Sequence, residues 1–271
     1  MDETIKTVQD FYNNNVASEW NRIANRPEFL LTCRMLDRYI KPNDTVLDIG
    51  GGPGRYSLYL AGKGCNVTLF DLSHANIKFA EERAAEHGLK IKTITGDAQE
   101  ADKLLGGQFD HILLMGPMYH LLEENARINA VNAALNLLKP NGILYVSFIN
   151  LFSGMIYAMK VEPEVLASTA SNEVKYVENV ISQKSFAGDA FSKAFMIEQS
   201  EILPFMSQFL LKKLHLFGQE SITAPCEDTI MSKPKELIDK WMDFCEKIWE
   251  RNDLLSWSEH LMHVGRKNTQ V

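Results

Sequence analysis

The segment that most constrains this chain is a cluster of glycines directly after a short apolar run. Val46-Leu47-Asp48-Ile49 has the composition of a buried strand, and Gly50-Gly51-Gly52-Pro53-Gly54 follows it at once. Glycine adopts positive φ angles and lets the backbone approach a ligand where a Cβ atom would collide. The pattern therefore predicts a strand, a tight turn and a helix whose first N–H groups are free. Open α/β sheets bind their ligands at such turns.

Strand and helix patterns alternate along the chain as far as residue 150. Short runs rich in β-branched and aromatic residues, bounded by turn residues, predict further strands at 65–70, 91–94, 109–114 and 143–148. Amphipathic helices are predicted between them, most clearly at 75–87, after the N-cap Ser73, and at 123–139. Two later strands, at 209–217 and 260–267, bring the number to seven, with the last one at an antiparallel edge. The fold class predicted is α/β, a doubly wound, mostly parallel seven-stranded sheet.

The flanking segments divide the chain into four parts. Residues 1–40 are predicted to be helical and to form an N-terminal lid, and residues 41–150 form the cofactor-binding core. Residues 151–197 lose the strand pattern and are rich in Met and Phe; we expect them to form a lid and a wall of the acceptor site, since such sites are mostly apolar. Residues 198–271 complete the core sheet and carry a helical insertion at about 220–257.

Composition and charge exclude several classes of function. The net charge of −7 disfavours RNA and DNA as partners. No apolar run reaches the roughly 20 residues that span a bilayer, so we expect no membrane partner. The four cysteines are far apart, which predicts neither a zinc site nor disulfides, and no metal site is expected. With no signal-peptide pattern at the start, the expected compartment is the cytoplasm.

Three acidic residues follow successive predicted strands: Asp48, Asp71 and Asp97. Asp71 lies roughly 20 residues after the first glycine of the turn, the spacing at which a carboxylate reaches ribose hydroxyls. Asp97 is placed to accept a hydrogen bond from an adenine amine, and Asp48 to hold the loop or meet a cationic group. Arg55 occupies the third glycine position of the dinucleotide fingerprint, and Pro53 removes an N–H that a phosphate would use. These features favour a nucleoside with a positive substituent, such as S-adenosylmethionine.

At this point the chain resembles the class I S-adenosylmethionine-dependent methyltransferases. The residues that carry the resemblance are Asp48–Gly54 for the first motif, Phe70–Ser73 for the ribose motif and Gly96–Ala98 for the adenine motif. Phe109–Leu114 is similar to the family's fourth strand, and Leu138–Gly142 to the turn before its fifth. The resemblance implies a Rossmann-like methyltransferase fold, S-adenosyl-L-methionine as cofactor and S-adenosyl-L-homocysteine as product. The expected cofactor-binding residues are Tyr12, Trp20, Arg22, Asp48, Gly50, Gly51, Gly52, Gly54, Tyr56, Asp71, Leu72, Asp97, Ala98 and Met115.

A narrower likeness extends over most of the chain. The segments 19–22, 116–121 and 258–267 are similar to a bacterial subgroup of methyltransferase-like proteins whose substrates are unassigned. The resemblance therefore implies the cofactor more firmly than the acceptor.

The candidate catalytic residues are His120, as a general base, and Tyr119, packed against substrate or sulfonium. A structural role at the start of a helix is an equal alternative for His120, and structural roles are expected for His260 and His263. Methyltransferases that act on base amines carry Asn or Asp ahead of Pro-Pro-Tyr/Phe, whereas this chain has Gly116, which offers no side-chain acceptor. The expected reaction is therefore methylation of a small molecule by in-line displacement, for which alignment supplies much of the acceleration.

Several alternatives remain open at this stage. Tyr12 and Trp20 either cover the cofactor, with an aromatic face on the sulfonium, or pack as part of a helix on the core. An RNA or protein methyltransferase of the same fold and a non-catalytic S-adenosylmethionine-binding module are the rival functions. A nicotinamide-dependent oxidoreductase is disfavoured by Pro53 and Arg55. The chain is expected to be a monomer or a homodimer.

Overall fold

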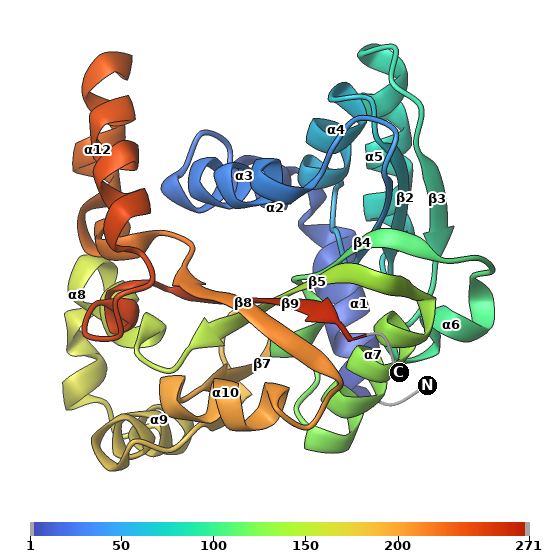
Figure 1. Cartoon of the computed structure of the whole chain (residues 1–271). Coiled ribbons are helices and arrows are strands. Elements are labelled where there is room, and N and C mark those ends of the chain that lie inside the picture. The colour runs from blue at the N-terminus through green and yellow to red at the C-terminus, as the bar shows by residue number, and fades with distance from the viewer. Residues whose placement is uncertain (1–2, 269–271) are drawn as a thin grey trace.

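Five parallel strands form the centre of the sheet in the computed structural model, which describes residues 3–268 (Figure 1). Their order is β3-β2-β1-β4-β5, and they comprise β1 (Thr45–Ile49), β2 (Asn66–Asp71), β3 (Lys92–Thr95), β4 (Phe109–Leu114) and β5 (Leu138–Asn150). The order reverses between β1 and β4, so a crevice opens at the carboxyl ends of these two strands. The predicted doubly wound, mostly parallel α/β sheet is confirmed.

Antiparallel strands extend the sheet beyond β5. β9 (His260–Lys267) pairs with β5, and β8 (Leu211–Gly218) pairs with β9. A further hairpin, β6 (Phe186–Asp189) and β7 (Lys193–Ile197), joins the sheet only at Ile149 and Asn150, the last residues of β5. The described residues thus form nine strands, so the predicted number of seven is too low. The hairpin was missed because its strands are short and Gly188 and Asp189 interrupt their apolar pattern.

Helices cover both faces of the sheet, which is why neighbouring residues of one strand are both buried. Val46 packs against the helices on one face of the sheet, and Leu47 packs against the helices on the other face. Both side chains are fully buried. The first face carries α3 (Pro27–Tyr39), α4 (Arg55–Gly62), α5 (His74–Glu86) and α12 (Lys235–Ile248), and the second carries α6 (Ala101–Leu104), α7 (Glu124–Leu137) and α10 (Gln199–Met206). The Ser73 cap predicted for α5 is present, with Ser73 Oγ accepting from the Asn76 N–H at 3.1 Å.

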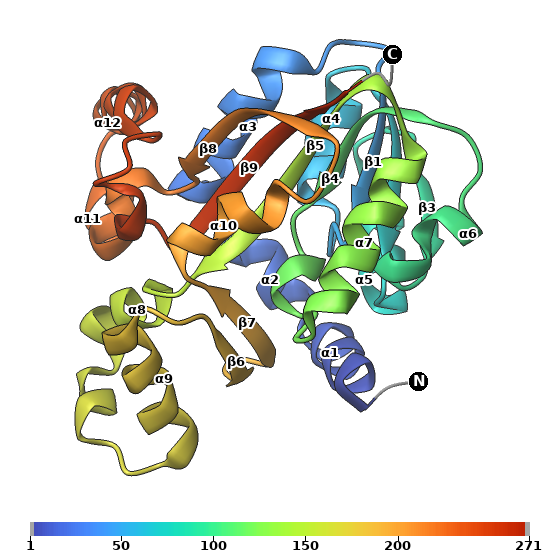
Figure 2. The same cartoon turned by 60° about the horizontal axis from the view of Figure 1, so that its bottom comes forward.

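The helices of residues 151–197 lie outside these two layers. Figure 2 shows α8 (Ser153–Val161) and α9 (Ser171–Ser182) grouped with the β6–β7 hairpin beyond one end of the sheet. α1 (Glu3–Asn14) contacts both α5 and β7. The short elements are α2 (Val16–Arg22), η1 (Ala98–Glu100), η2 (Pro117–Tyr119), η3 (Pro163–Ala167), η4 (Ser221–Cys226), α11 (Glu227–Met231) and η5 (Leu255–Trp257). Within residues 3–268, none of the helices has the length and apolar character needed to cross a membrane.

The two glycines at the ends of α4 provide a matched test of the turn. Gly54 has a φ of +84°, and a Cβ atom there would lie 2.9 Å from Ala80 Cβ, whereas Gly62 has nothing within 4 Å of its Cβ position. We expect Gly54→Ala to lower the free energy of unfolding by about 1–3 kcal/mol through backbone strain and overpacking. Gly62→Ala should leave it unchanged or raise it by up to about 1 kcal/mol. Urea unfolding measures both; equal effects would contradict the packing described for the turn.

Candidate functional site

Two adjoining cavities lie at the carboxyl edge of the sheet. The edge cavity, of about 140 Å³, is lined by the glycine turn, the ends of β2 and β4, the segment after β3, and side chains of α1. The insert cavity, of about 780 Å³, is lined mainly by α8, α9 and the β6–β7 hairpin. Small-molecule sites usually measure roughly 300–1,000 Å³, so the edge cavity is narrow; the side chains of Ile5, Val8 and Tyr12 enter it from α1.

The glycine turn packs directly against the segment that follows β4. Gly50 N–H donates to the carbonyl of Phe70 at 2.7 Å, which ties the turn to β2. A Cβ atom on Gly50 would lie 2.4 Å from Pro117 Cδ, and one on Gly116 would lie 2.5 Å from the Gly50 carbonyl oxygen. Gly50 and Gly52 both have positive φ angles. The three glycines of the turn therefore present main-chain atoms, without side chains, to the edge cavity.

Asp71, at the end of β2, is held by three donors of the protein itself. Its Oδ1 accepts from the Ser73 N–H at 2.8 Å and from Asn76 Nδ2 at 3.1 Å, and its Oδ2 accepts from the Gly52 N–H at 2.8 Å. Burial raises the pKa of this carboxyl group, although the three donors oppose the shift. Asp71 therefore joins the ribose motif to the glycine turn. Oδ1 already accepts two hydrogen bonds, whereas Oδ2 accepts one and keeps a lone pair for a ligand.

Asp97 and Ala98 begin the short η1 turn after β3. Asp97 Oδ1 accepts from the Gln99 N–H at 2.9 Å and so caps this turn. Both residues line the edge cavity. The structure thus places the predicted ribose and adenine acids along one edge, each at the end of its own strand.

Asp48 is fully buried beneath the turn and lacks a full set of partners. Its Oδ2 accepts from Ser57 Oγ at 2.8 Å, while its Oδ1 has no partner among the described residues. Burial raises the pKa of Asp48 to about 7, with Ser57 opposing and Asp71 reinforcing the shift. A buried carboxyl oxygen without a donor is costly, and this residue lines the edge cavity.

His120, the predicted general base, has both ring nitrogens engaged. Nδ1 donates to the carbonyl of Lys193 at 2.9 Å, which leaves Nε2 to accept from the Tyr12 hydroxyl at 2.6 Å. Burial lowers the pKa of His120 to about 4. His120 lines the edge cavity, as does Tyr119, but this geometry does not favour a proton-accepting role for it.

Trp20 and Gly54 are the two predicted cofactor-binding residues that are not among those lining the edge cavity. The Arg55 guanidinium stacks 3.8 Å from the Trp20 ring centroid, and Arg55 Nε donates to the Trp20 carbonyl at 2.9 Å. The expectation that Trp20 faces a sulfonium is thus corrected: Arg55 already occupies its aromatic face. Gly54 serves the close packing of the turn on Ala80.

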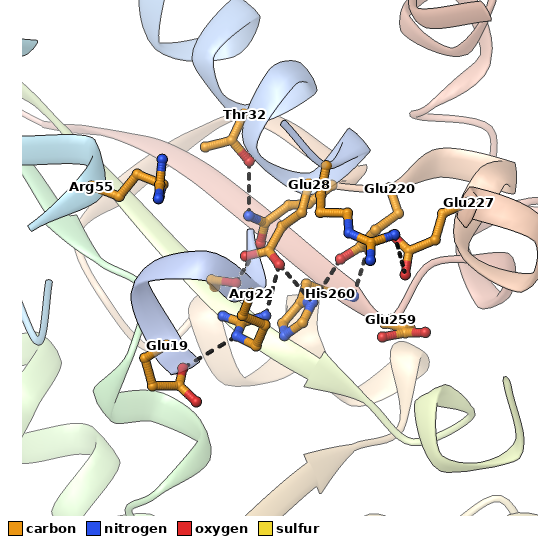
Figure 3. Close-up of polar contacts among 12 residues, drawn as sticks. Glu19, Arg22, Glu28, Thr32, Arg55, Glu220, Glu227, Glu259 and His260 are labelled. Carbon is orange, nitrogen blue, oxygen red and sulfur yellow. Dashed lines mark hydrogen bonds and ion pairs between the residues drawn. The ribbon is translucent and has the colours of Figure 1, made fainter. Parts of the chain in front are cut away.

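A charged cluster at the junction of the two cavities was missed by sequence reasoning. Figure 3 shows Glu28 and Glu220 on either side of one edge of the His260 ring, with Arg22 below Glu28. His260 Nδ1 donates to Glu220 Oε1 at 2.7 Å, and Arg22 Nη1 donates to Glu28 Oε2 at 2.9 Å. Burial alone would lower the pKa of His260, but Glu28 and Glu220 raise it to about 9. The structural role predicted for His260 is therefore incomplete, because this residue lines both cavities.

The same cluster is the group of described residues with the spacing of a metal site. Glu28, Glu220 and His260 each offer one ligand atom, and these atoms lie within 4.8 Å of one another. Arg22 and the imidazolium of His260 already supply positive charge to the two carboxylates. Gln219 adds a further polar side chain to the lining of the edge cavity. Its amide nitrogen donates to Thr32 Oγ1 at 2.9 Å, and its amide oxygen accepts from Ser147 Oγ.

Glu28, Ser147, Gln219 and His260 come from four separate segments of the chain, so no local motif joins them. The one available signal was the segment 258–267, which carries the narrower likeness and contains His260. Residues 151–197 supply both apolar and polar side chains to the insert cavity. The large apolar ones are Tyr157, Tyr176, Phe186, Phe191 and Met196, and the acidic ones are Glu162, Glu173 and Asp189.

Known proteins similar to this chain share its core and its overall fold. The family model described as a methyltransferase domain matches residues 46–142. A ubiquinone biosynthesis O-methyltransferase of Caulobacter vibrioides is 37% identical over 106 residues, which are 39% of this chain and 41% of that protein. A protein of the same name from Actinobacillus pleuropneumoniae serotype 7 is 31% identical over 161 residues, 55% of this chain and 67% of the relative. The chain thus spans about two fifths of the first of these relatives and two thirds of the second.

Solved structures match nearly the whole chain at low sequence identity. A magnesium protoporphyrin IX methyltransferase from Synechocystis PCC 6803, with S-adenosylhomocysteine bound, has a TM-score of 0.58 at 15% identity over 98% of this chain and all of that one. A 1,6-didemethyltoxoflavin-N1-methyltransferase from Burkholderia thailandensis has a TM-score of 0.59 at 13% identity, with 97% and 88% of the two chains covered. These likenesses show the fold. Together with the sequence relatives and the glycine turn, they show that the chain belongs to the class I S-adenosylmethionine-dependent methyltransferases.

Proposed function

We propose that this protein transfers the methyl group of S-adenosylmethionine to a small molecule bound in the insert cavity. The observation that carries the proposal is the shared wall of the two cavities. Tyr12, Glu19, Arg22, Tyr119 and His260 line both of them. A methyl group delivered along the edge cavity therefore reaches an acceptor without leaving the protein.

The proposed cofactor position follows the order of the strand ends. The ribose hydroxyls bind Asp71, the adenine amine binds Asp97 beside Ala98, and the main chain of Gly50–Gly52 contacts the sugar and methionine carbons. The ammonium group of the methionine part binds Asp48, whose Oδ1 lacks a donor among the described residues. Asp48 and Asp71 place negative charge near the positively charged nucleoside, as expected for a sulfonium ligand.

We further propose that residues 1–40 include a lid formed by α1. Gln9 Nε2 donates to the Leu72 carbonyl at 2.9 Å, Ser73 Oγ donates to Asn13 Oδ1 at 2.7 Å, and the Tyr12 hydroxyl donates to His120 Nε2 at 2.6 Å. These hydrogen bonds of α1 would have to break for the lid to open. The narrow edge cavity requires the side chains of α1 to move aside when a nucleoside enters.

The acceptor is held by the insert, residues 151–197, whose aromatic side chains bind an apolar or aromatic body. The reaction is an in-line displacement, in which the acceptor atom attacks the methyl carbon opposite the sulfur. Alignment of the two ligands across the shared wall supplies much of the rate enhancement, up to about 7–11 kcal/mol in well-oriented systems.

Calorimetry and label transfer test this function together. We expect the protein to bind S-adenosylmethionine but not NAD, and to transfer its labelled methyl group to a small-molecule fraction of a cell extract. Asp71→Asn should weaken cofactor binding about 10- to 100-fold, because a charged hydrogen-bond acceptor is lost. Asp239→Asn, an exposed substitution on α12, is the matched control and should change nothing. Tighter binding of NAD, or wild-type affinity in Asp71→Asn, would contradict the proposed cofactor site.

We expect the buried charge of Asp48 to lower the free energy of unfolding when no cofactor is bound, and cofactor binding to offset this effect. The raised pKa of Asp48 means that the folded state binds more protons than the unfolded state between the ordinary value of 3.8 and about pH 7. The contribution of Asp48 therefore makes the protein less stable as pH rises through that window. Asp48→Asn should therefore raise the free energy of unfolding above that of the wild type by more at pH 8 than at pH 5. The same variant should bind S-adenosylmethionine more weakly. Urea unfolding at the two pH values and calorimetry measure this; a variant that binds normally would show that the ammonium lies elsewhere.

A further inference from the structure

His260 lies where the two cavities meet, with one ring nitrogen held and the other directed away from its carboxylate partners. It begins β9 and lines both cavities. Figure 3 shows Nδ1 toward Glu220 and Glu28 and the far side of the ring turned away from both. No hydrogen bond to Nε2 is found within residues 3–268.

Glu220 is fixed as firmly as the histidine that it holds. Besides Nδ1 of His260, its carboxylate accepts from Ser258 Oγ at 2.6 Å and from the His260 N–H at 3.0 Å. The side chain is buried, and its pKa is lowered because the charge on His260 and the three donors outweigh the effect of burial. A buried carboxylate on Nδ1 fixes the tautomer in which Nε2 is the proton acceptor, as in the Ser-His-Asp triad.

We propose that His260, positioned by Glu220, is the general base that removes the proton of a weakly acidic hydroxyl acceptor, a phenol or an enol. This inference rests on the proposed function and names the acceptor class of the same site. Tyr119 lies beside the base, with ring centroids 6.1 Å apart, and shares the wall of both cavities.

The proposed step balances without any further reactant. The acceptor oxygen forms a bond to the methyl carbon as the carbon–sulfur bond breaks, and its electron pair stays on sulfur in S-adenosylhomocysteine. The hydroxyl proton passes to Nε2 of His260, and the positive charge of the sulfonium ends on the imidazolium. Glu220 stabilises that imidazolium through Nδ1, and solvent removes the proton after the products leave.

The charges around His260 match a phenol or enol better than an aliphatic alcohol. Glu28 from α3 and Glu220 ahead of η4 favour the imidazolium, while Arg22 from α2 disfavours it. Glu259, the preceding residue, also faces it, and its own pKa is raised by burial and by Glu220. The resulting pKa of His260, about 9, is close to that of a phenol, roughly 10, so proton transfer between them is nearly balanced.

Two other assignments for this region fit the structure less well. His120 has both nitrogens engaged by Tyr12 and Lys193 and a pKa lowered by burial. A metal ion on Glu28, Glu220 and His260 would have to displace the His260–Glu220 hydrogen bond and compete with Arg22 for Glu28. The test below separates both from the proposal.

The first arm of the test needs no acceptor. In protein labelled with ¹⁵N-histidine, NMR titration should show that His260 keeps Nδ1 protonated throughout and titrates well above the usual pKa of a histidine. Glu220→Gln should lower that pKa, because one of the two carboxylates that favour the imidazolium is removed. A normal pKa for His260, or no change in Glu220→Gln, would overturn the proposed pair.

The second arm measures transfer from S-[methyl-¹³C]adenosylmethionine to a panel of monophenols, catechols, β-dicarbonyl enols, primary amines and thiols. We expect O-methylated products, with kcat/KM rising with pH up to about 9. His260→Asn should lower kcat at least about 100-fold, the contribution of a general base, with S-adenosylmethionine affinity unchanged. Glu220→Gln should move the rising limb to lower pH. His263→Gln, on the opposite face of β9, is the control and should keep wild-type kcat.

Each contrary outcome has a distinct meaning. Products methylated only on nitrogen or sulfur, or a loss of the pH dependence in His120→Asn instead of His260→Asn, would overturn the inference. Loss of turnover on chelation, restored by Mg²⁺, would make the cluster a metal site and also overturn it. Cofactor binding without transfer to any class would contradict the proposed function itself, and the NMR arm then still decides whether Glu220 holds His260 as a titrating base.

Discussion

The site depends on the close contact between the glycine turn after β1 and the segment that follows β4. The turn at Gly50 and the segment at Gly116–Pro117 lie so close that a Cβ atom on either glycine would collide with the other stretch. This contact joins the ends of β1 and β4, where the strand order reverses. It leaves the Gly52 N–H beside Asp71 and keeps the crevice open. The path of the backbone therefore determines where the ligand site lies, and the functional side chains are added to it.

The parts of the fold that local sequence determines were predicted well. The runs 45–49 and 109–114 form β1 and β4, and the Ser73 cap begins α5. Each of these depends on a pattern within a few residues. The final strand is antiparallel as predicted, but it lies between β5 and β8 and not at the edge of the sheet. The β6–β7 hairpin depends instead on its pairing with the last two residues of β5, an interaction that the local pattern does not encode.

The same distinction explains which site residues were found. Asp48, Asp71 and Asp97 follow their strands directly, and parallel strands bring such positions to one edge. Glu28, Glu220 and His260 meet only because α3, the segment before η4, and β9 pack around the end of β5. Trp20 shows the reverse error: its aromatic face suggested a contact with the sulfonium, but Arg55, seven residues after Asp48, stacks on its ring.

The central claim is that the cofactor lies along the strand ends with its sulfur at the wall shared by the two cavities. A crystal structure with S-adenosylhomocysteine bound measures this most directly. The account predicts ribose hydroxyls on Asp71, the ammonium on Asp48 and the sulfur facing Tyr119 and His260, with α1 displaced outward. An adenosyl group bound elsewhere, or a sulfur turned away from the insert cavity, would contradict it.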